Sequence, residues 1–559
     1  MKKNFRFFRQ SRIRSRRIIF DFQKIFLTLI ILLAGFLRLW ELDKFPIGLN
    51  ADEAAIGYNA YSLILTGKDE HGNFWPIHFK SFADYKPGGY FYLVLPFVKI
   101  LGLNEWAVRL PSALIGIGGI LGIFLLVKEI FGNQKLALIS ALFLAISPWH
   151  IHFSRGGWET NIASTFILFG VYFFLRALKE PKFFIFSFLF WVFSLYTYHS
   201  PRIIIPLLGL NLIVFFKRHI FLKKNFKHFL IGGIIAGLIS IPLLVDFFGP
   251  AGTARFSGLS LFSDIGPYSL ILSLRGEHQN SNEFLARILH NRPFIYGIQF
   301  LKNYLSFFDG NFLFLIGDRV ERNNSSAVGE MYFLDLIFIF AGIYFFFRKK
   351  PKNWFLPFVW LLIAPIAGAL TFQVPSALRA HNMVFPLIII SAYGFFNLLN
   401  LFKSKFLNSF ICLFLSALLF WNFFYFLHQY FVHYPKTSPQ AWEYGFRELV
   451  EYLKPIKDNY SKIYVTEKYD QPYILFLFYL QYPPEIFQKE VILTPRDKFG
   501  FSTVRHFANF HFENIDWKKL EKQKNVLIVG TEEEIPPEAK IIKIIYFPNG
   551  KPAFKIAEI

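Results

Sequence analysis

The sequence has 559 residues, of which 54% are hydrophobic, and a formal net charge of +22. Apolar runs near 20 residues recur along it, and each is long enough to cross roughly 30 Å of hydrocarbon. The composition therefore excludes an ordinary water-soluble domain and indicates a polytopic membrane protein. The charge does not indicate nucleic-acid binding, because the basic residues cluster at the ends of apolar runs, where they report topology.

The chain begins with a basic segment, residues 1–24, before a first span at about 25–40. Basic flanks stay in the cytoplasm, so we expect this end to be cytoplasmic. We do not expect a cleaved signal peptide, because no small-residue cleavage site follows the apolar run. The first loop, residues 41–106, then lies outside the cell.

Whether Tyr90–Gly102 crosses the membrane decides the rest of the topology. A helix of this length reaches only about 20 Å, and Pro96 and Lys99 interrupt it, so we expect it to lie in the outer interface. Eleven spans then remain, and they are expected near residues 25–40, 107–130, 136–151, 160–178, 183–198, 202–216, 229–248, 330–347, 354–372, 382–402 and 406–427.

The basic clusters agree with this assignment. With eleven spans, every cluster between spans falls on the cytoplasmic side: Lys128 and Lys135; Arg176, Lys179 and Lys182; Lys217 to Lys227; Arg348 to Lys352; Lys403 and Lys405. The sequence thus predicts a transmembrane α-helical domain over residues 25–428 and an extracytoplasmic α/β domain over residues 429–559. Strands are expected at Lys462–Thr466, Asn525–Val529, Ile541–Phe547 and Ala553–Ile556.

The first outer loop opens with an expected surface helix from Asn50 to Gly67. Asn50 can cap it, Glu53 stands three residues on, and Gly67 can end it. Asp52 and Glu53 fall in the first turn, where the helix dipole favours carboxylates. These acids are therefore either a helix-end pair or part of a site.

The sequence contains few candidate metal ligands. Cys412 is the single cysteine, which excludes a disulfide within the chain and a multi-thiolate metal site. His150 and His152 are two residues apart and face different sides of a helix. We expect no cofactor, although ligand chemistry alone leaves a divalent metal open.

Four motifs carry a resemblance: Leu-Asn-Ala-Asp-Glu-Ala at 49–54, Asp84-Tyr-Lys-Pro-Gly-Gly, Arg109-Leu-Pro-Ser-Ala-Leu, and Ser154-Arg-Gly-Gly-Trp-Glu. Over roughly residues 25–400 the chain resembles glycosyltransferase family 39, which includes protein O-mannosyltransferases and the aminoarabinose transferase of lipid A. The resemblance implies a GT-C type membrane fold. It also implies transfer of a sugar from a polyprenyl-phosphate donor to an acceptor hydroxyl at the outer membrane face, with neither sugar nor acceptor specified.

The resemblance also implies roles for single residues. Asp52 matches the acid of the first loop and would be the base, with Glu53 beside it, while Glu159 occupies the place of a second acid. Lys86 matches the lysine of the Lys-Pro step and would hold the donor phosphate. Apart from the resemblance, Arg109, Arg155 and Arg379 lie outside or near the expected outer boundary, and we expect at least one of them to complete a phosphate clamp with Lys86. Tyr85 stands where an acid would favour a metal, and Gly88 replaces a second proline.

Two other classes of protein remain open from the residues. A flippase or transporter of lipid-linked sugars would need charged or broken helices at the membrane midplane, whereas the ionisable residues here gather on one side. A non-catalytic scaffold would bind partners through residues 429–559. An acidic pair, a Lys-Pro step and a third acid on one side favour the enzyme.

Overall fold

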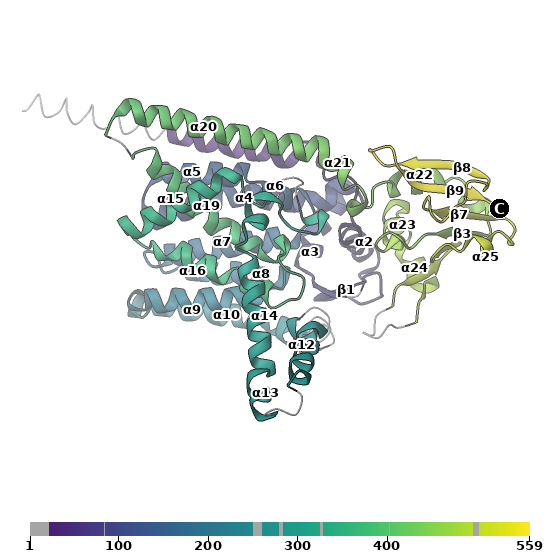
Figure 1. The fold of residues 1–559 in the computed structure, drawn as a ribbon, viewed down its shortest axis with the longest axis horizontal. Helices are drawn as coiled ribbons and strands as arrows, with labels where there is room; N and C mark the ends of the chain where they lie inside the picture. Colours follow the sequence, from purple (N-terminus) through teal and green to yellow (C-terminus); the bar gives the residue numbers. More distant parts are fainter. Residues whose placement is uncertain are drawn as a thin grey trace, which may run out of the picture.

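The computed structural model describes residues 22–82, 84–249, 260–278, 283–324, 328–401, 403–495 and 502–559. Most of the basic segment 1–24 lies outside these ranges. Figure 1 shows a bundle of roughly parallel and antiparallel helices, a sheet domain at one end of the bundle, and a helical arm that projects from its side. The expected fold class, a helical membrane domain followed by an α/β domain, is confirmed.

The bundle has a helix or a broken helix pair at each of the eleven expected spans. Its helices are Phe22–Leu39, α4 (Glu105–Phe131), α5 (Gln134–Ile146) with α6 (Pro148–Arg155), α7 (Glu159–Ala177), α8 (Phe183–Thr197), α9 (Pro201–Ile220), α10 (Lys223–Phe247), α15 (Phe333–Lys349), α16 (Phe355–Ile363) with α17 (Ile366–Ala369), α19 (Val384–Leu398) and α20 (Lys405–His428). Among the described residues, seven helices are long and apolar enough to span a membrane by themselves, or eight if α5 and α6 count as one span.

The expected span 136–151 is not one straight helix. α5 and α6 meet at an angle of 56°. Pro148 cannot continue the hydrogen bonding of α5, and the Ser147 side chain accepts a hydrogen bond from the backbone N–H of His150 to begin α6. The break gives α6, which ends with Arg155, a direction different from that of α5.

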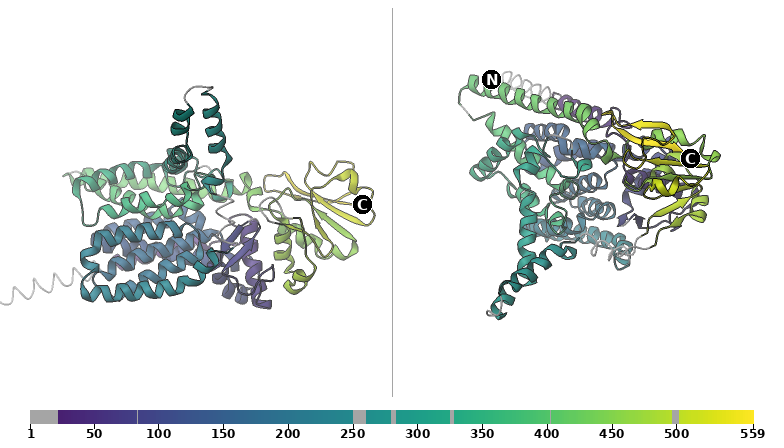
Figure 2. Two further views of the ribbon diagram at one scale, coloured as in Figure 1. Left: turned by 90° about the horizontal axis from the view of Figure 1, so that it is seen from below. Right: turned by 45° about the vertical axis from the view of Figure 1, so that its right-hand side comes forward.

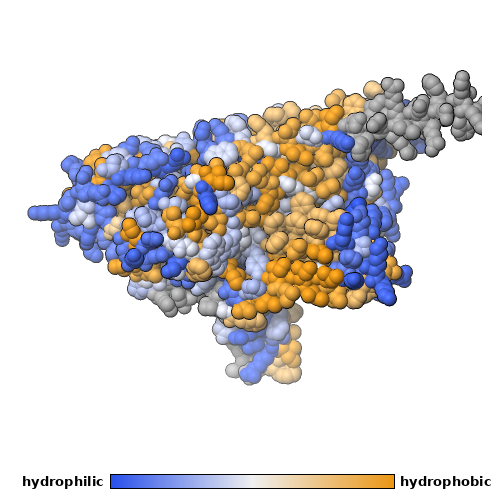
Figure 3. Space-filling view, turned by 180° about the vertical axis from the view of Figure 1, so that it is seen from behind, coloured by the Kyte–Doolittle hydropathy of each residue, from blue (hydrophilic) through white to orange (hydrophobic). Residues whose placement is uncertain are grey.

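One face of the bundle carries a broad apolar band. Figure 3 shows one face on which hydrophobic side chains form a broad band between a hydrophilic end and the hydrophilic sheet domain. Inside the bundle, α15 and α19 touch backbone to backbone, because a Cβ on Gly394 would lie 1.9 Å from the carbonyl oxygen of Phe338. Small residues at such crossings are how membrane helices pack closely.

The first outer loop forms a layer between the bundle and the sheet domain (Figures 1 and 2). It contains α2 (Ala51–Thr66), a hairpin of β1 (His78–Ser81) and β2 (Asp84–Pro87), and α3 (Gly89–Leu101). The expected helix is confirmed with its capping box at Asn50 and its left-handed Gly67. The helix expected at 90–102 is α3, whose 13 residues are too few to span a bilayer. The hairpin was not expected.

The long loop 249–329 is largely helical where it is described. It forms the arm of α12 (Ile265–Gly276), α13 (Glu283–Leu289) and α14 (Arg292–Ser306), which stands out sideways from the bundle (Figure 2). After a π-helical turn, Asn311–Leu315, the chain returns to the layer of the first outer loop through Asp318 and Arg322.

The sheet domain follows α20 and α21 (Tyr434–Thr437). Its seven strands have the order β4-β5-β6-β3-β7-β9-β8, with β3 parallel to both β6 and β7. The strands are β3 (Lys462–Val465), β4 (Ile492–Leu493), β5 (Val504–Phe507), β6 (Phe510–Phe512), β7 (Val526–Gly530), β8 (Ile541–Tyr546) and β9 (Pro552–Glu558). The helices are α22 (Phe446–Leu453), α23 (Pro472–Leu480), α24 (Pro484–Glu490) and α25 (Trp517–Leu520). α23 packs against α2, which joins this domain to the first outer loop.

Candidate active site

Three of the predicted site residues meet at the end of the bundle that faces the sheet domain. Asp52 comes from the first turn of α2, Lys86 from β2, and Glu159 is the first residue of α7. Lys86 Nζ lies 2.5 Å from Asp52 Oδ1 and 3.9 Å from Glu159 Oε1. The structure thus brings together one ammonium group and two carboxylates from three separate segments.

Lys86 is held in the charged state at this position. Burial disfavours its ammonium, but Asp52 and then Glu159 more than compensate, so the pKa of Lys86 is raised above its ordinary value. Its side chain is 15% exposed and that of Asp52 is 25% exposed, so both can be reached from outside. The site therefore offers a fixed cation next to an accessible carboxylate.

Sequence reasoning missed Arg322, which lies on the other side of Asp52. Its Nη2 is 3.8 Å from Asp52 Oδ2 and its Nη1 is 3.6 Å from Asp470 Oδ2 in the sheet domain. His152 Nε2 donates to the backbone carbonyl of Arg322 at 2.8 Å and fixes the segment. The charged run Gly317-Asp-Arg-Val-Glu-Arg was the available signal, but no spacing in the sequence connects it to Asp52.

Glu53 and Arg109 form a buried clamp rather than an open site. Arg109 donates to both carboxylate oxygens of Glu53, at 2.8 and 2.9 Å, and to the carbonyl oxygens of Leu42, Pro46 and Gly48. Glu53 also accepts from Gly157 N–H at 2.7 Å. These hydrogen bonds use the N–H groups of the guanidinium, and the Arg109 side chain has no exposed surface. Arg109 therefore has no N–H group left to bind a phosphate. We therefore assign the pair to positioning α2, not to the chemistry.

Arg155 is likewise buried and holds the end of the first helix. Its two terminal nitrogens donate to the carbonyl oxygens of Leu37, Trp40, Glu41 and Phe45. The guanidinium also stacks over the ring of Phe431 at 5.2 Å. An arginine whose terminal nitrogens donate to four carbonyl groups at the end of the first helix and in the turn after it has a structural role, so we do not place it in a phosphate clamp.

Arg379 is partly exposed and lies beside the site rather than in it. Its Nη1 donates to Thr371 Oγ1 at 2.7 Å. The neighbouring Leu378 carbonyl accepts from Thr160 Oγ1 at 2.9 Å, which places this segment next to Glu159. Of the three predicted arginines, Arg379 is the one that is not buried, and its guanidinium also donates to Gln373, to the backbone carbonyl oxygen at 2.7 Å and to Oε1 at 3.1 Å.

A polar cluster anchors the hairpin that carries Lys86. Arg202 Nη2 donates to His78 Nε2 at 2.7 Å, so the proton of His78 is on Nδ1, which donates to Asp246. His199 Nε2 donates to the carbonyl of Tyr85 at 3.1 Å. Burial lowers the pKa of His78, although the hydrogen bond to Asp246 opposes this shift. The imidazole is therefore neutral in this arrangement. The cluster fixes the hairpin to the ends of α9 and α10.

The described histidines near the site do not form a set of metal ligands. In the described part of the chain no group of three His, Cys, Asp or Glu side chains is placed to hold a metal ion. His150 hydrogen-bonds Arg38, and His152 hydrogen-bonds the backbone of Arg322, so the two serve different segments.

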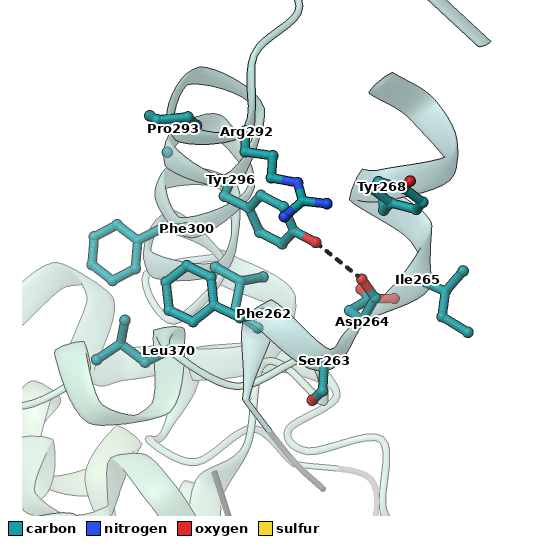
Figure 4. Close-up of a pocket in the computed structure, with 12 residues that line it drawn as sticks. Phe262, Ser263, Asp264, Ile265, Tyr268, Arg292, Pro293, Tyr296, Phe300 and Leu370 are labelled. Atoms are coloured by element: carbon teal, nitrogen blue, oxygen red, sulfur yellow. Dashed lines mark hydrogen bonds between the residues drawn. The ribbon is translucent and has the colours of Figure 1, made fainter. Parts of the chain in front are cut away.

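One hollow borders the site and a second lies on the arm. A polar cleft of about 770 Å³ lies between Arg322 and the sheet domain. A mostly apolar pocket of about 760 Å³ lies between α12 and α14 (Figure 4). In it the Arg292 guanidinium sits over the ring of Tyr268 at 5.2 Å, beside Tyr296. Leu370 in the wall of this pocket precedes Thr371, whose hydroxyl accepts a hydrogen bond from Arg379.

The arrangement has counterparts in solved structures. ArnT from Cupriavidus metallidurans matches with a TM-score of 0.54 at 11% identity, over 96% of this chain and 98% of that one. The Archaeoglobus fulgidus oligosaccharyltransferase matches with a TM-score of 0.52 at 13% identity, over 82% and 63%. Bundle and sheet domain together therefore have the GT-C type fold.

Sequence comparison adds a family match. Residues 85–245 match the family described as dolichyl-phosphate-mannose-protein mannosyltransferase. YycA of Bacillus subtilis (strain 168), provisionally named a mannosyltransferase, is 27% identical over 165 residues, which are 28% of this chain and 22% of YycA. YkcB of the same strain, similarly named, is 30% identical over 15% of this chain and 12% of its own length. The chain thus spans less than a quarter of these curated relatives, and the predicted resemblance to the family is confirmed over the stretch that contains Lys86 and Glu159.

Proposed function

We propose that this protein is a membrane glycosyltransferase that moves a sugar from a polyprenyl-phosphate-linked donor to an acceptor hydroxyl on the outer face of the membrane. The observation that carries the proposal is the placement of Lys86 between Asp52 and Glu159 at one end of an apolar bundle. The family match over residues 85–245 and the fold shared with ArnT support the same reaction class. A second structure of that ArnT, matching with a TM-score of 0.52, has undecaprenyl phosphate bound.

In the proposed reaction, a cation stabilises the leaving group and a base activates the acceptor. The acceptor oxygen attacks the anomeric carbon, the bond from that carbon to the phosphate oxygen breaks, and the phosphate keeps the electron pair. Lys86 neutralises the charge that grows on the leaving phosphate. Asp52 takes the proton of the acceptor hydroxyl, which is otherwise a poor nucleophile. Arg322, 3.8 Å from Asp52, replaces Arg109 and Arg155 as the second cation of the proposed phosphate site.

The ion pair at the site implies an order of binding. Without a donor, the Lys86 ammonium contacts Asp52 at 2.5 Å and competes with any proton that Asp52 could take. A donor phosphate would draw the ammonium toward itself, because phosphate is the stronger charge partner. Asp52 is then released to face the acceptor, so the donor binds before the acceptor becomes reactive.

The lipid part of the donor has a candidate apolar site on the arm. The pocket of Figure 4 lies between α12 and α14, and Phe262, Phe300 and Leu370 are among the residues that line it. The backbone N–H of Leu261 donates to the Leu370 carbonyl at 2.8 Å, which fixes the root of the arm against the bundle. Thr371, the next residue, accepts a hydrogen bond from Arg379, so a prenyl chain lying in this pocket would have Arg379 as a neighbouring cation. From the positions of the basic clusters between the spans, we also place α2, the hairpin and the sheet domain outside the cell.

The test is turnover of labelled polyprenyl-phosphate sugar by purified Asp52→Asn protein. Loss of a general base lowers the rate by roughly 10²–10⁴-fold. Glu159→Gln is the matched control, because it removes a neighbouring carboxylate that also contacts Lys86. Near-full turnover by correctly inserted Asp52→Asn, together with its loss in Glu159→Gln, would move the base to Glu159. If the labelled donor instead crossed the membrane, so that reagents on its original side no longer reached it, and no sugar was transferred, the protein would be a transporter.

A further inference from the structure

The helices of the arm carry stripes of exposed apolar side chains. On α14 the stripe recurs at helical spacing along most of the helix, and its members are Phe294, Ile298, Leu301 and Leu305. These side chains are between 37% and 56% exposed. α12 carries a second stripe, formed by Ile265, Tyr268 and Leu272. A surface helix normally turns such a stripe toward its own core, so stripes that remain exposed indicate an apolar surrounding.

The arm runs across the direction of the bundle helices. Figure 1 shows α14 standing across the direction of α9, α10 and α20, and the left view of Figure 2 shows the arm crossing the bundle direction from a second angle. Helices that span a bilayer run through it, so an element with the orientation of the arm extends along the plane of the bilayer. Whether the stripes of the arm meet lipid or water then depends on the depth at which the arm leaves the bundle.

The root of the arm is attached to the lipid-facing side of a span. Asn303 Nδ2 donates to the carbonyl oxygens of Ala369 at 3.2 Å and Thr371 at 2.9 Å, at the end of α17. The hydroxyl of Tyr304 donates to the carbonyl oxygen of Leu362 at 2.8 Å, which lies further inside the same span, in α16. The Leu362 side chain is 55% exposed, so this side of the span faces lipid. The arm thus leaves the bundle below the end of a span and on its lipid-facing side.

α14 separates its polar contacts from its apolar stripe. Gln299 Nε2 donates to Asn303 Oδ1 at 2.9 Å, and Asn303 in turn holds the bundle, so these two positions form a polar face. Two exposed cations, Arg292 and Lys302, stand near the two ends of the same helix, and Lys302 directly follows Leu301 of the stripe. In a helix at a membrane interface, basic side chains extend their charged ends to the lipid phosphate groups while the apolar face lies among the acyl chains. α14 has both features of such a helix.

We propose that the arm of α12, α13 and α14 lies in the leaflet on the side of the sheet domain, with its apolar stripes among the acyl chains and with Arg292 and Lys302 at the level of the phospholipid phosphate groups. The partner of this surface is the lipid of the bilayer, and not a second copy of the chain or another protein. The inference does not depend on the proposed transfer reaction. Because the pocket of Figure 4 lies between α12 and α14, a lipid chain then reaches it without leaving the leaflet.

The test measures what surrounds the stripes. A nitroxide label is attached at Leu272→Cys, Leu301→Cys or Lys302→Cys in a Cys412→Ser background, and the full-length protein is placed in nanodiscs of phosphatidylcholine and phosphatidylglycerol. These side chains are exposed, so the substitutions leave the packing of the arm intact. Electron paramagnetic resonance then compares the collisions of the label with oxygen, which concentrates in hydrocarbon, and with a nickel chelate, which stays in water.

Two controls calibrate the collisions. Leu238→Cys is the lipid control, because Leu238 is 60% exposed on the span α10, and Lys524→Cys, exposed on the sheet domain, is the water control. We expect Leu272→Cys and Leu301→Cys to favour oxygen as Leu238→Cys does, and Lys302→Cys to meet the nickel chelate more often than its neighbour Leu301→Cys. Nickel access at Leu301→Cys equal to that at Lys524→Cys would place the arm in water and overturn the proposal. A label at Leu301→Cys that neither reagent reaches would show that protein covers the stripe, and this result would overturn it as well.

Discussion

Glu53→Gln should destabilise the protein, although Glu53 is adjacent to the proposed base. Glu53 supplies two of the oxygens that receive the Arg109 N–H groups, and the Arg109 side chain has no exposed surface. Glutamine keeps one acceptor oxygen but turns an N–H₂ group toward the guanidinium and removes the compensating charge. Breaking one partner of a buried ion pair costs about 3–5 kcal/mol, which is a large part of the usual 5–15 kcal/mol of folding stability.

The assay is the thermal midpoint of the purified protein in detergent, compared with that of Asp52→Asn. Asp52 is 25% exposed, so loss of its partly solvated ion pair should cost only about 1 kcal/mol. We expect a low yield and a clearly lower midpoint for Glu53→Gln, and a nearly unchanged midpoint for Asp52→Asn. A Glu53→Gln protein that is as stable as the wild type but inactive would show that Glu53 takes part in the chemistry.

Two further predictions concern topology and pH. In a Cys412→Ser background, an impermeant thiol reagent added to intact cells should label Lys68→Cys and leave Lys227→Cys unlabelled, and the reverse pattern would invert the topology. Burial raises the pKa of Glu70 to about 8, so the wild type should lose thermal stability as pH rises from about 4.5 toward 8, while Glu70→Gln should not. Parallel pH profiles for the two proteins would contradict the buried neutral carboxyl.

Local rules predicted much of this molecule correctly. The helix after Asn50 follows from its capping box and from Gly67, and both act within a few residues. The helix expected at 90–102 is present as α3 with 13 residues, while its position in the membrane interface, inferred from its length, Pro96 and Lys99, stays a prediction. The strands β3, β7, β8 and β9 were expected from apolar runs, whereas β4 to β6 are short and were missed.

Interactions between distant segments could not be predicted in the same way. Arg109, Arg155 and Arg322 all lie at the end of the bundle that faces the sheet domain, and nothing in the neighbouring sequence distinguishes an arginine of a buried clamp from a cation of the site. Arg109 is structural because Glu53 and three carbonyl groups converge on it from other segments. Arg322 reaches Asp52 because a loop 270 residues later folds back over α2. The sequence indicates which ionisable residues lie between the apolar runs, but only folding decides which of them meet.

The contact of Asp470 with Arg322 also bears on how the protein is made. Asp52 belongs to the first loop to leave the ribosome, whereas Asp470 is near the end of the chain. The ion-pair chain from Lys86 through Asp52 and Arg322 to Asp470 cannot close until the last domain has been synthesised and has reached the same side of the membrane. A nascent chain stalled before that point would carry an incomplete site, so biogenesis itself delays the proposed reaction until the sheet domain is in place.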